Sequence, residues 1–107
     1  MIVFTLQLKV EPQKRWDVLR TIHSMTGPTM ARHGCLHCSL YSDTSNDDEL
    51  ILLEKWESQE AMEGHICSDE FRKVMSAMEA ACEPPEMQFS RITSAVGMKL
   101  VEEILTT

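Results

Sequence analysis

The sequence predicts an α+β fold in which a four-stranded antiparallel sheet carries helices on one face. Three patterns lead to this prediction. Apolar and polar residues alternate over residues 2–10, as in a half-buried strand. Two more strand-like runs, 35–43 and 49–57, flank a polar turn. Helical spacing follows Pro12 and Ser58. The resulting order, β–α–β–β–α–α–β, is that of a ferredoxin-like arrangement.

The first helix should begin near Pro12, because proline suits the opening turn of a helix. Two adjacent rows then share the helix surface: Trp16, Leu19 and His23 in one, and Val18, Ile22, Met25 and Thr29 in the other. Gly27–Pro28 predicts a kink or an interruption, followed by a last turn that ends near His33. Gly34 would terminate that turn.

The middle of the chain predicts a hairpin. Residues 44–48 form its polar turn, and the strand 49–57 follows. One face of that strand carries Leu50, Leu52, Glu54 and Trp56, and the other carries Ile51, Leu53 and Lys55. Because both faces are apolar at the centre, we expect helices on one side and a second layer on the other. We expect a homodimer to supply that layer.

Two short helices should follow, each opened by a serine N-cap, at Ser58 and at Ser68. Ala61, Met62, His65 and Ile66 fall on one face of the first helix, so His65 should point inward. The second helix should present one apolar stripe, made of Phe71, Val74, Met75, Met78 and Cys82.

After Pro84–Pro85 a last strand is expected over residues 86–96. The tail, residues 98–107, has Met98, Val101, Ile104 and Leu105 at helical spacing. We therefore divide the chain into a domain of residues 1–97 and a short helical tail of residues 98–107, whose apolar face must dock on another surface.

Composition restricts the classes of function. The chain has 107 residues, enough for one domain with a real core, and a net charge of −7. That charge argues against nucleic acid as a partner, because phosphate binding needs a basic face. No apolar run approaches the ~20 residues of a membrane span, so we expect no membrane partner. The first residues do not resemble a signal peptide, and a cytoplasmic location is expected by default.

Cys35 and Cys38 form a C-x-x-C pair, which is compatible with redox or metal chemistry. Residues three apart on a strand point to opposite faces, so we expect the two thiols to diverge. A second paired motif for zinc is missing from the sequence. We therefore expect no metal site and no disulfide between Cys35 and Cys38. The methionines occur at helical core spacing and are interpreted as packing residues.

His65 is the best candidate for a functional residue. It lies on the inward face of its helix, Trp56 ends the preceding strand, and Phe71 and Met75 follow on the next helix. Together these side chains suit an apolar pocket with one titratable group, which is a common composition for a small-ligand site. The alternative is a core histidine with a satisfied hydrogen bond.

Several short motifs resemble the antibiotic biosynthesis monooxygenase family. They are Gly34–Cys35–Leu36, the run from Glu54 to Ser58, and Glu60–Ala61 with His65, Ser68 and Phe71 behind it. The resemblance covers roughly residues 1–96. It implies a dimeric α+β barrel with a pocket in each subunit between sheet and helices. Family members include cofactor-independent monooxygenases of quinols and anthrones, haem-degrading enzymes and enzymes of autoinducer breakdown.

The resemblance also bears on individual residues. His65 matches the histidine common in the quinol-monooxygenase-like branch. The haem-degrading branch carries a tryptophan in place of His65 and an axial histidine in place of Met75, which argues against haem here. Position 38 is commonly aromatic in the family, whereas this chain has Cys38, so its pocket should have a different shape.

We therefore expect a cofactor-independent monooxygenase that uses molecular oxygen on a small aromatic or quinol-like compound. A deprotonated phenol can supply the first electron to oxygen itself, so the protein needs only a base and an apolar pocket. His65 would be the base, and Trp56, Phe71, Met75 and Cys38 would contact the substrate. Two alternatives remain open: a dimeric module that binds a small molecule without catalysis, and an isomerase on the same fold.

Overall fold

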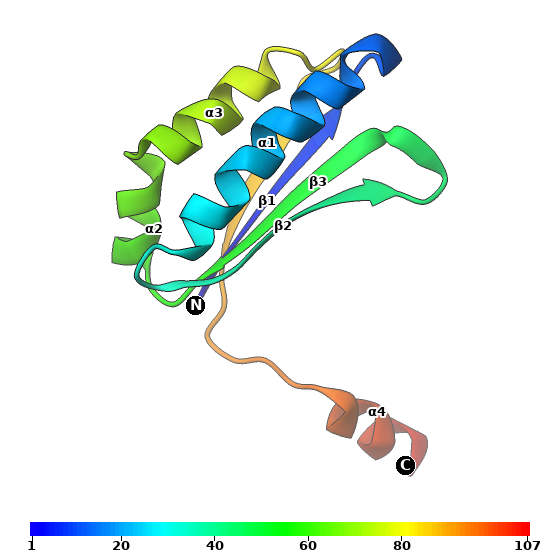
Figure 1. Ribbon diagram of the computed structural model, residues 1–107. Helices are drawn as coiled ribbons and strands as arrows, with labels where there is room; N and C mark the ends of the chain where they lie inside the picture. Colours follow the sequence, from blue (N-terminus) through cyan, green and yellow to red (C-terminus); the bar gives the residue numbers. More distant parts are fainter.

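The computed structural model describes residues 1–107 and has the predicted order of elements, with an additional 3₁₀ turn, Pro12–Lys14, before the first helix. The elements are β1 Ile2–Lys9, α1 Arg15–Met30, β2 Cys35–Asp43, β3 Asn46–Trp56, α2 Gln59–Ile66, α3 Asp69–Met78, β4 Glu86–Arg91 and α4 Met98–Leu105. The strands form one antiparallel sheet in the order β2-β3-β1-β4. Helices α1, α2 and α3 lie together on one face of it (Figure 1). The predicted α+β, ferredoxin-like class is confirmed.

The core lies between the sheet and these three helices. The even-numbered residues of β1, and those of β3 from Leu50 to Trp56, face inward and are buried, as their alternation predicts. From α1 the row Val18, Ile22, Met25 and Thr29 is buried against them. The second predicted row, Trp16, Leu19 and His23, lies at the border of the core and is partly or largely exposed.

Helix α1 corrects the prediction at Gly27–Pro28, because it runs without interruption to Met30. Pro28 removes one backbone donor, but only in the last turn of the helix. The end of the helix is closed normally, since the Ala31 N–H bonds to the Gly27 carbonyl at 3.1 Å. Thr29 and Met25 are buried against the sheet and hold this turn in place.

The hairpin is tighter than predicted. Asp43 pairs with Asn46, so only Thr44 and Ser45 form the turn, and β3 begins three residues earlier than expected. The Asp43 carboxylate accepts from the Ser45 N–H at 2.7 Å and so stabilises the turn locally.

A bulge in β2 corrects the prediction for the cysteines. The pairing register shifts between Cys35 and His37, so that Cys35 lies opposite Trp56 and Cys38 lies opposite Glu54. Trp56 and Glu54 both face inward, and directly paired residues share a face. The two cysteines therefore point to the same face of the sheet. Leu36 occupies the bulge, and its side chain is exposed.

Gly34 precedes this bulge with φ at +84°, in the left-handed region that favours glycine. Its carbonyl accepts from the Glu57 N–H at 2.8 Å, which ties the start of β2 to the end of β3. A Cβ atom at this position would lie 2.5 Å from the Ala61 Cβ on α2. The glycine thus brings the loop close to α2.

Both predicted serine N-caps are confirmed. The Ser58 hydroxyl accepts from the Ala61 N–H, and the Ser68 hydroxyl accepts from the Phe71 N–H. The stripe on α3 differs from the prediction: Phe71, Val74 and Ala77 are its buried residues. Met75 is 49% exposed, and Cys82 is exposed beyond the end of the helix. The buried residues therefore follow each other every three positions and end at the small Ala77, whereas the prediction had continued through Met75 and Met78.

The final strand, β4, ends at Arg91 and is five residues shorter than expected. The predicted tail helix is present as α4, and it lies away from the body of the molecule after an extended linker (Figure 1). All its residues are exposed. The sheet face opposite the helices is also open (Figure 1). No helix is both long enough and apolar enough to cross a membrane.

Candidate functional site

A polar cluster made of Glu54, Trp56 and His65 lies inside the core. Glu54 and Trp56 are adjacent inward residues of β3, and His65 reaches them from the last turn of α2. The His65 Nε2 atom lies 3.0 Å from Glu54 Oε1 and 3.2 Å from Oε2. The Trp56 Nε1–H donates to Glu54 Oε1 at 3.0 Å. Because Glu54 and His65 are each only 1% exposed, these contacts are shielded from water.

The other ring nitrogen of His65, Nδ1, is buried and has no hydrogen-bond partner. A proton on Nδ1 would be a buried donor without an acceptor, which is costly. A proton on Nε2 donates to the Glu54 carboxylate instead. We therefore assign the neutral ring the Nε2–H tautomer, which leaves an unshared electron pair at Nδ1. A histidine oriented by a carboxylate in this way has the arrangement of a general base.

Aromatic rings enclose His65. Its ring stacks on Trp56 with the centroids 4.8 Å apart, and Phe71 meets it edge-on at 5.4 Å. Phe71 in turn contacts Phe4 at 6.0 Å, and Phe4 contacts Phe89 of β4 at 4.8 Å. This row of rings leads from the buried histidine to the edge of the sheet.

An open cleft of about 560 Å³ lies at the outer end of that row, between α2 and the first and last strands. Its lining residues are Ile2, Gln59, Met62, Glu63, Ile66, Phe89, Ser90 and Arg91. A polar chain crosses it, in which Arg91 donates to Gln59 and Gln59 donates to Glu63. The cleft therefore combines an apolar floor with one cation, one carboxylate and one amide, the usual make-up of a small-ligand site.

The structure brings only some of the predicted site residues together. Trp56, His65 and Phe71 meet around one point, but they fill the space with their own rings, and none of the surface cavities is lined by them. The expected apolar pocket at this point is replaced by packed side chains. Met75 lies on the solvent side of α3, apart from the cluster.

Cys38 is buried opposite Glu54 on the neighbouring strand. Burial, together with the nearby Glu54 carboxylate, raises the pKa of its thiol to about 12. Burial also raises the pKa of the Cys35 thiol. Both groups are therefore held in the neutral form, and a neutral thiol is a poor nucleophile and a poor metal ligand.

Two residues of this region escaped the sequence analysis. The sequence pattern puts Glu54 on the same strand face as Trp56 and gives it no role. A buried carboxylate needs a polar partner, and His65 is the polar side chain that the sequence predicts to point inward. Arg91 gave no signal of its own, because its place at the cleft depends on β4 pairing with β1, where Arg91 lies opposite Ile2.

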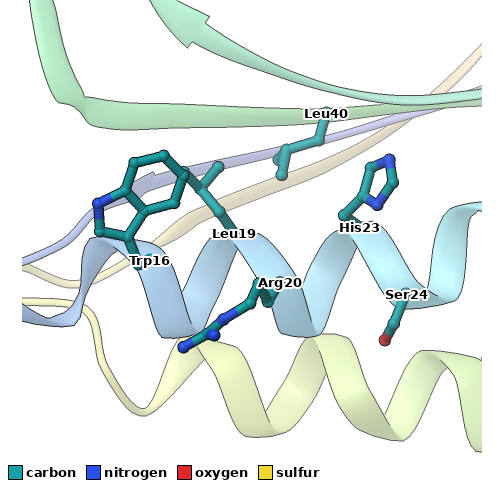
Figure 2. Close-up of a pocket in the computed structure, with 6 residues that line it drawn as sticks. All are labelled: Trp16, Leu19, Arg20, His23, Ser24 and Leu40. Carbon is teal, nitrogen blue, oxygen red and sulfur yellow. The ribbon is translucent and has the colours of Figure 1, made fainter.

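A second, smaller groove of about 360 Å³ lies between α1 and β2. Figure 2 shows the side chains of Trp16, Leu19 and His23 directed from α1 toward β2, and Leu40 directed back toward the helix. Arg20 and Ser24 point away from that strand at the border (Figure 2). The structure contains no cluster of three or more side chains arranged to hold a metal ion.

The sequence of this chain matches one protein-family model and is similar to known proteins. The family model described as antibiotic biosynthesis monooxygenase matches residues 1–77. An uncharacterized protein of Synechocystis is 24% identical over 92 residues, which cover 85% of this chain but only 63% of that protein. YcnE, a candidate monooxygenase of Bacillus subtilis, is 31% identical over 65 residues, covering 61% of this chain and 68% of that protein.

Solved structures share the fold. A candidate antibiotic biosynthesis monooxygenase from Deinococcus radiodurans has a TM-score of 0.81 at 14% identity, with 91% of this chain and 97% of that chain covered. Rv0793 of Mycobacterium tuberculosis has a TM-score of 0.80 at 21% identity, with 90% and 98% covered. At these identities the structures support the fold, whereas the family model covers most of the sequence. The chain belongs to the antibiotic biosynthesis monooxygenase family.

Proposed function

We propose that this protein is a monooxygenase that oxidises a small quinol-like aromatic compound with molecular oxygen and needs no cofactor. One observation carries the proposal: the buried Glu54–His65 pair, in which Glu54 holds Nε2 and leaves Nδ1 without a partner. An unpartnered nitrogen on an oriented imidazole is suited to accept the proton of a phenol.

The substrate would lie in the cleft between α2 and β4. Phe89 offers a ring surface there, and Arg91 offers a cation for a phenolate or carbonyl oxygen. Met62 and Ile66 line the cleft and flank His65 on α2, so they separate the substrate from the imidazole. Met62 is flexible and adaptable. A shift of its side chain would open the way to Nδ1.

Deprotonation makes the chemistry possible. A phenolate or carbanion gives one electron to oxygen far more readily than the neutral compound does. The ring radical and superoxide then combine to a peroxide, whose O–O bond breaks as the ring hydrogen is lost as a proton. One oxygen atom stays on the ring as a carbonyl, the other leaves as water, and the substrate supplies all four electrons. In this scheme the protein takes up the proton, orients the ring and excludes bulk water. The aromatic rings around His65 favour the exclusion of bulk water.

Oxygen uptake tests the proposal. Purified, metal-depleted protein would be mixed with a panel of quinols and anthrones, and consumption of oxygen followed. His65→Ala should lower the rate by about a hundred- to ten-thousandfold. The rate of the parent should fall in acid, because a protonated imidazole cannot accept a proton. His33→Ala is the matched control, since that ring is 95% exposed. Activity of His65→Ala within a few-fold of the parent would reject the base role.

A second candidate function is a binding module without catalysis. The observation that favours it is the packing of His65, whose ring lines no cavity. A ligand would then occupy the cleft and leave the imidazole as a structural partner of Glu54. Binding of quinols without oxygen uptake would support this candidate. Conversion of the ligand without oxygen uptake would point instead to an isomerase that uses His65 for proton transfer.

We also propose that two copies pair through the open sheet face. Its central positions are Val3 on β1 and Ile51 and Leu53 on β3, all only partly buried. Two such faces pack about 10 Å apart and bury their apolar side chains. Sedimentation at micromolar concentration should give a dimer. A stable monomer of 12.2 kDa would contradict the pairing.

A further inference from the structure

Helix α4 has no partner in its own chain. It is eight residues long and carries an apolar arc made of Met98, Leu100, Val101, Ile104 and Leu105. These side chains are 44–80% exposed. Isolated helices shorter than ~12 residues are marginal in water, so α4 needs a surface on which to bury this arc.

The groove between α1 and β2 has the matching character. Its floor is formed by Leu19 and Leu40, and Trp16 forms one wall while remaining 68% exposed. A concave apolar surface with an exposed tryptophan is the kind of site that accepts the apolar face of a helix. The indole would lose most of its remaining exposure if a helix occupied the groove.

Charges on the two surfaces are complementary. The border of the groove carries Arg20, and Arg15 lies over the Trp16 ring at 5.3 Å. Asp17 pairs with Arg20 at 2.7 Å, but both groups are largely exposed, so this pair is weak. The polar side of α4 carries two carboxylates, Glu102 and Glu103, beside the apolar arc.

The sheet order argues against docking within one chain. Three strand spacings of ~4.8 Å separate β4 from β2, or about 14 Å. The linker would cross that width beneath the open face, turn round β2 and rise by about one layer of ~10 Å. Residues 92–97 join Arg91 to Met98 and span at most ~25 Å when fully extended. The route to the groove of the same chain adds up to about 24 Å and includes two turns, so it would need almost the whole extended length of the linker.

A second copy removes this obstacle. If two open faces pack about a two-fold axis parallel to the strands, β4 of one sheet lies opposite β2 of the other. The linker then needs to pass only the partner sheet at its edge, about 20 Å in all for two layers. We propose that α4 of each copy packs its apolar arc into the α1–β2 groove of the other copy. This proposal rests on the two-copy association proposed above.

Three variants of the full chain test the exchange. Ile104→Gln disables the tail and Trp16→Gln disables the groove, and both side chains are mostly exposed, so the fold should persist. Lys99→Gln, on the polar side of α4, is the matched control. In sedimentation, Ile104→Gln and Trp16→Gln should each raise the dimer dissociation constant about tenfold or more, and Lys99→Gln should leave it unchanged. Trp16 fluorescence should shift to longer wavelength in Ile104→Gln.

Mixing distinguishes exchange from docking within a chain. An Ile104→Gln chain with an intact groove can accept the intact tail of a Trp16→Gln chain, so the mixed dimer keeps one contact and each homodimer keeps none. The mixture should therefore associate about tenfold more tightly than either variant alone. Equal association of all three would overturn the exchange. A parent dimer unaffected by Ile104→Gln would overturn it while leaving the sheet pairing intact, and a monomeric parent would overturn both.

Discussion

Glu54→Gln is the substitution that tests the buried pair most directly. The amide has nearly the shape of the carboxylate, and its oxygen can still accept from the Trp56 Nε1–H. Its NH₂ group would then face His65 Nε2, where the carboxylate of the parent accepts a hydrogen bond. The imidazole would respond by moving its proton to Nδ1, so that Nε2 accepts from the amide. The variant should therefore reverse the tautomer and remove the free electron pair.

The size of the effect follows from the contacts. Two hydrogen bonds to a charged acceptor become bonds to a neutral amide, a loss of about 1 kcal/mol each. The proton on Nδ1 would be buried without an acceptor, which adds about 1–3 kcal/mol. We expect unfolding in urea to require about 3–5 kcal/mol less free energy than in the parent. Catalysis should fall by about a hundred- to ten-thousandfold, since the base has lost its free nitrogen.

Nitrogen chemical shifts of labelled imidazole report the tautomer, urea titration reports stability, and oxygen uptake reports function. Glu86→Gln, an exposed position on β4, is the control and should change none of the three. A parent ring with its proton on Nδ1 would refute the assigned tautomer. Unchanged turnover in Glu54→Gln, despite a reversed tautomer, would refute the role of Nδ1 as a base.

Three further predictions concern structure rather than turnover. Gly34→Ala should destabilise the fold by about 1–3 kcal/mol in urea titration, because its φ is positive and a Cβ there would collide with α2. A thiol reagent at pH 8 should label exposed Cys67 well before Cys38, whose raised pKa keeps it neutral; fast labelling of Cys38 would contradict its burial. The Arg32 guanidinium 2.8 Å away lowers the pKa of Glu70, so this pair stabilises the fold above the ordinary carboxyl pKa and the gain is lost as pH falls through the lowered one. Glu70→Gln should therefore lose under about 1 kcal/mol at neutral pH and nothing in strong acid.

The periodic spacing of apolar residues was sufficient to predict the strands, the helices and their order. Alternation in β1 and β3 is visible in the sequence because each strand has one strongly apolar face buried against helices. Both serine caps were predictable, since their side chains bond to amides three residues away and depend on nothing distant. Inward orientation of His65 followed from the spacing of α2 alone.

Features set by tertiary contacts could not be predicted in this way. The bulge at Leu36 leaves no mark on local spacing, yet it turns Cys35 and Cys38 to the same face. On α3 the helix packs against the sheet through Ala77 and leaves Met75 exposed, although the methionine side chain has the larger apolar surface. The cleft itself lies between α2 and β4, which are separated in the sequence by residues 67–85, so its lining depends on the sheet order.

Stability alone does not account for a buried Glu54–His65 pair. Taking the Glu54 carboxylate out of water costs several kcal/mol, burying the imidazole adds a smaller cost, and the bond between the two groups often only offsets the sum. Apolar side chains of similar volume would pack against Trp56 and Phe71 without that cost. A double variant, Glu54→Leu with His65→Phe, should therefore be as stable as the parent or more so in urea titration, while either single change leaves a buried group unpaired and costs about 3–5 kcal/mol. If the double variant is stable and inert toward oxygen, the pair is explained by chemistry. If it is as destabilised as the single variants, the pair is a requirement of the fold, and the case for His65 as a base loses its physical support.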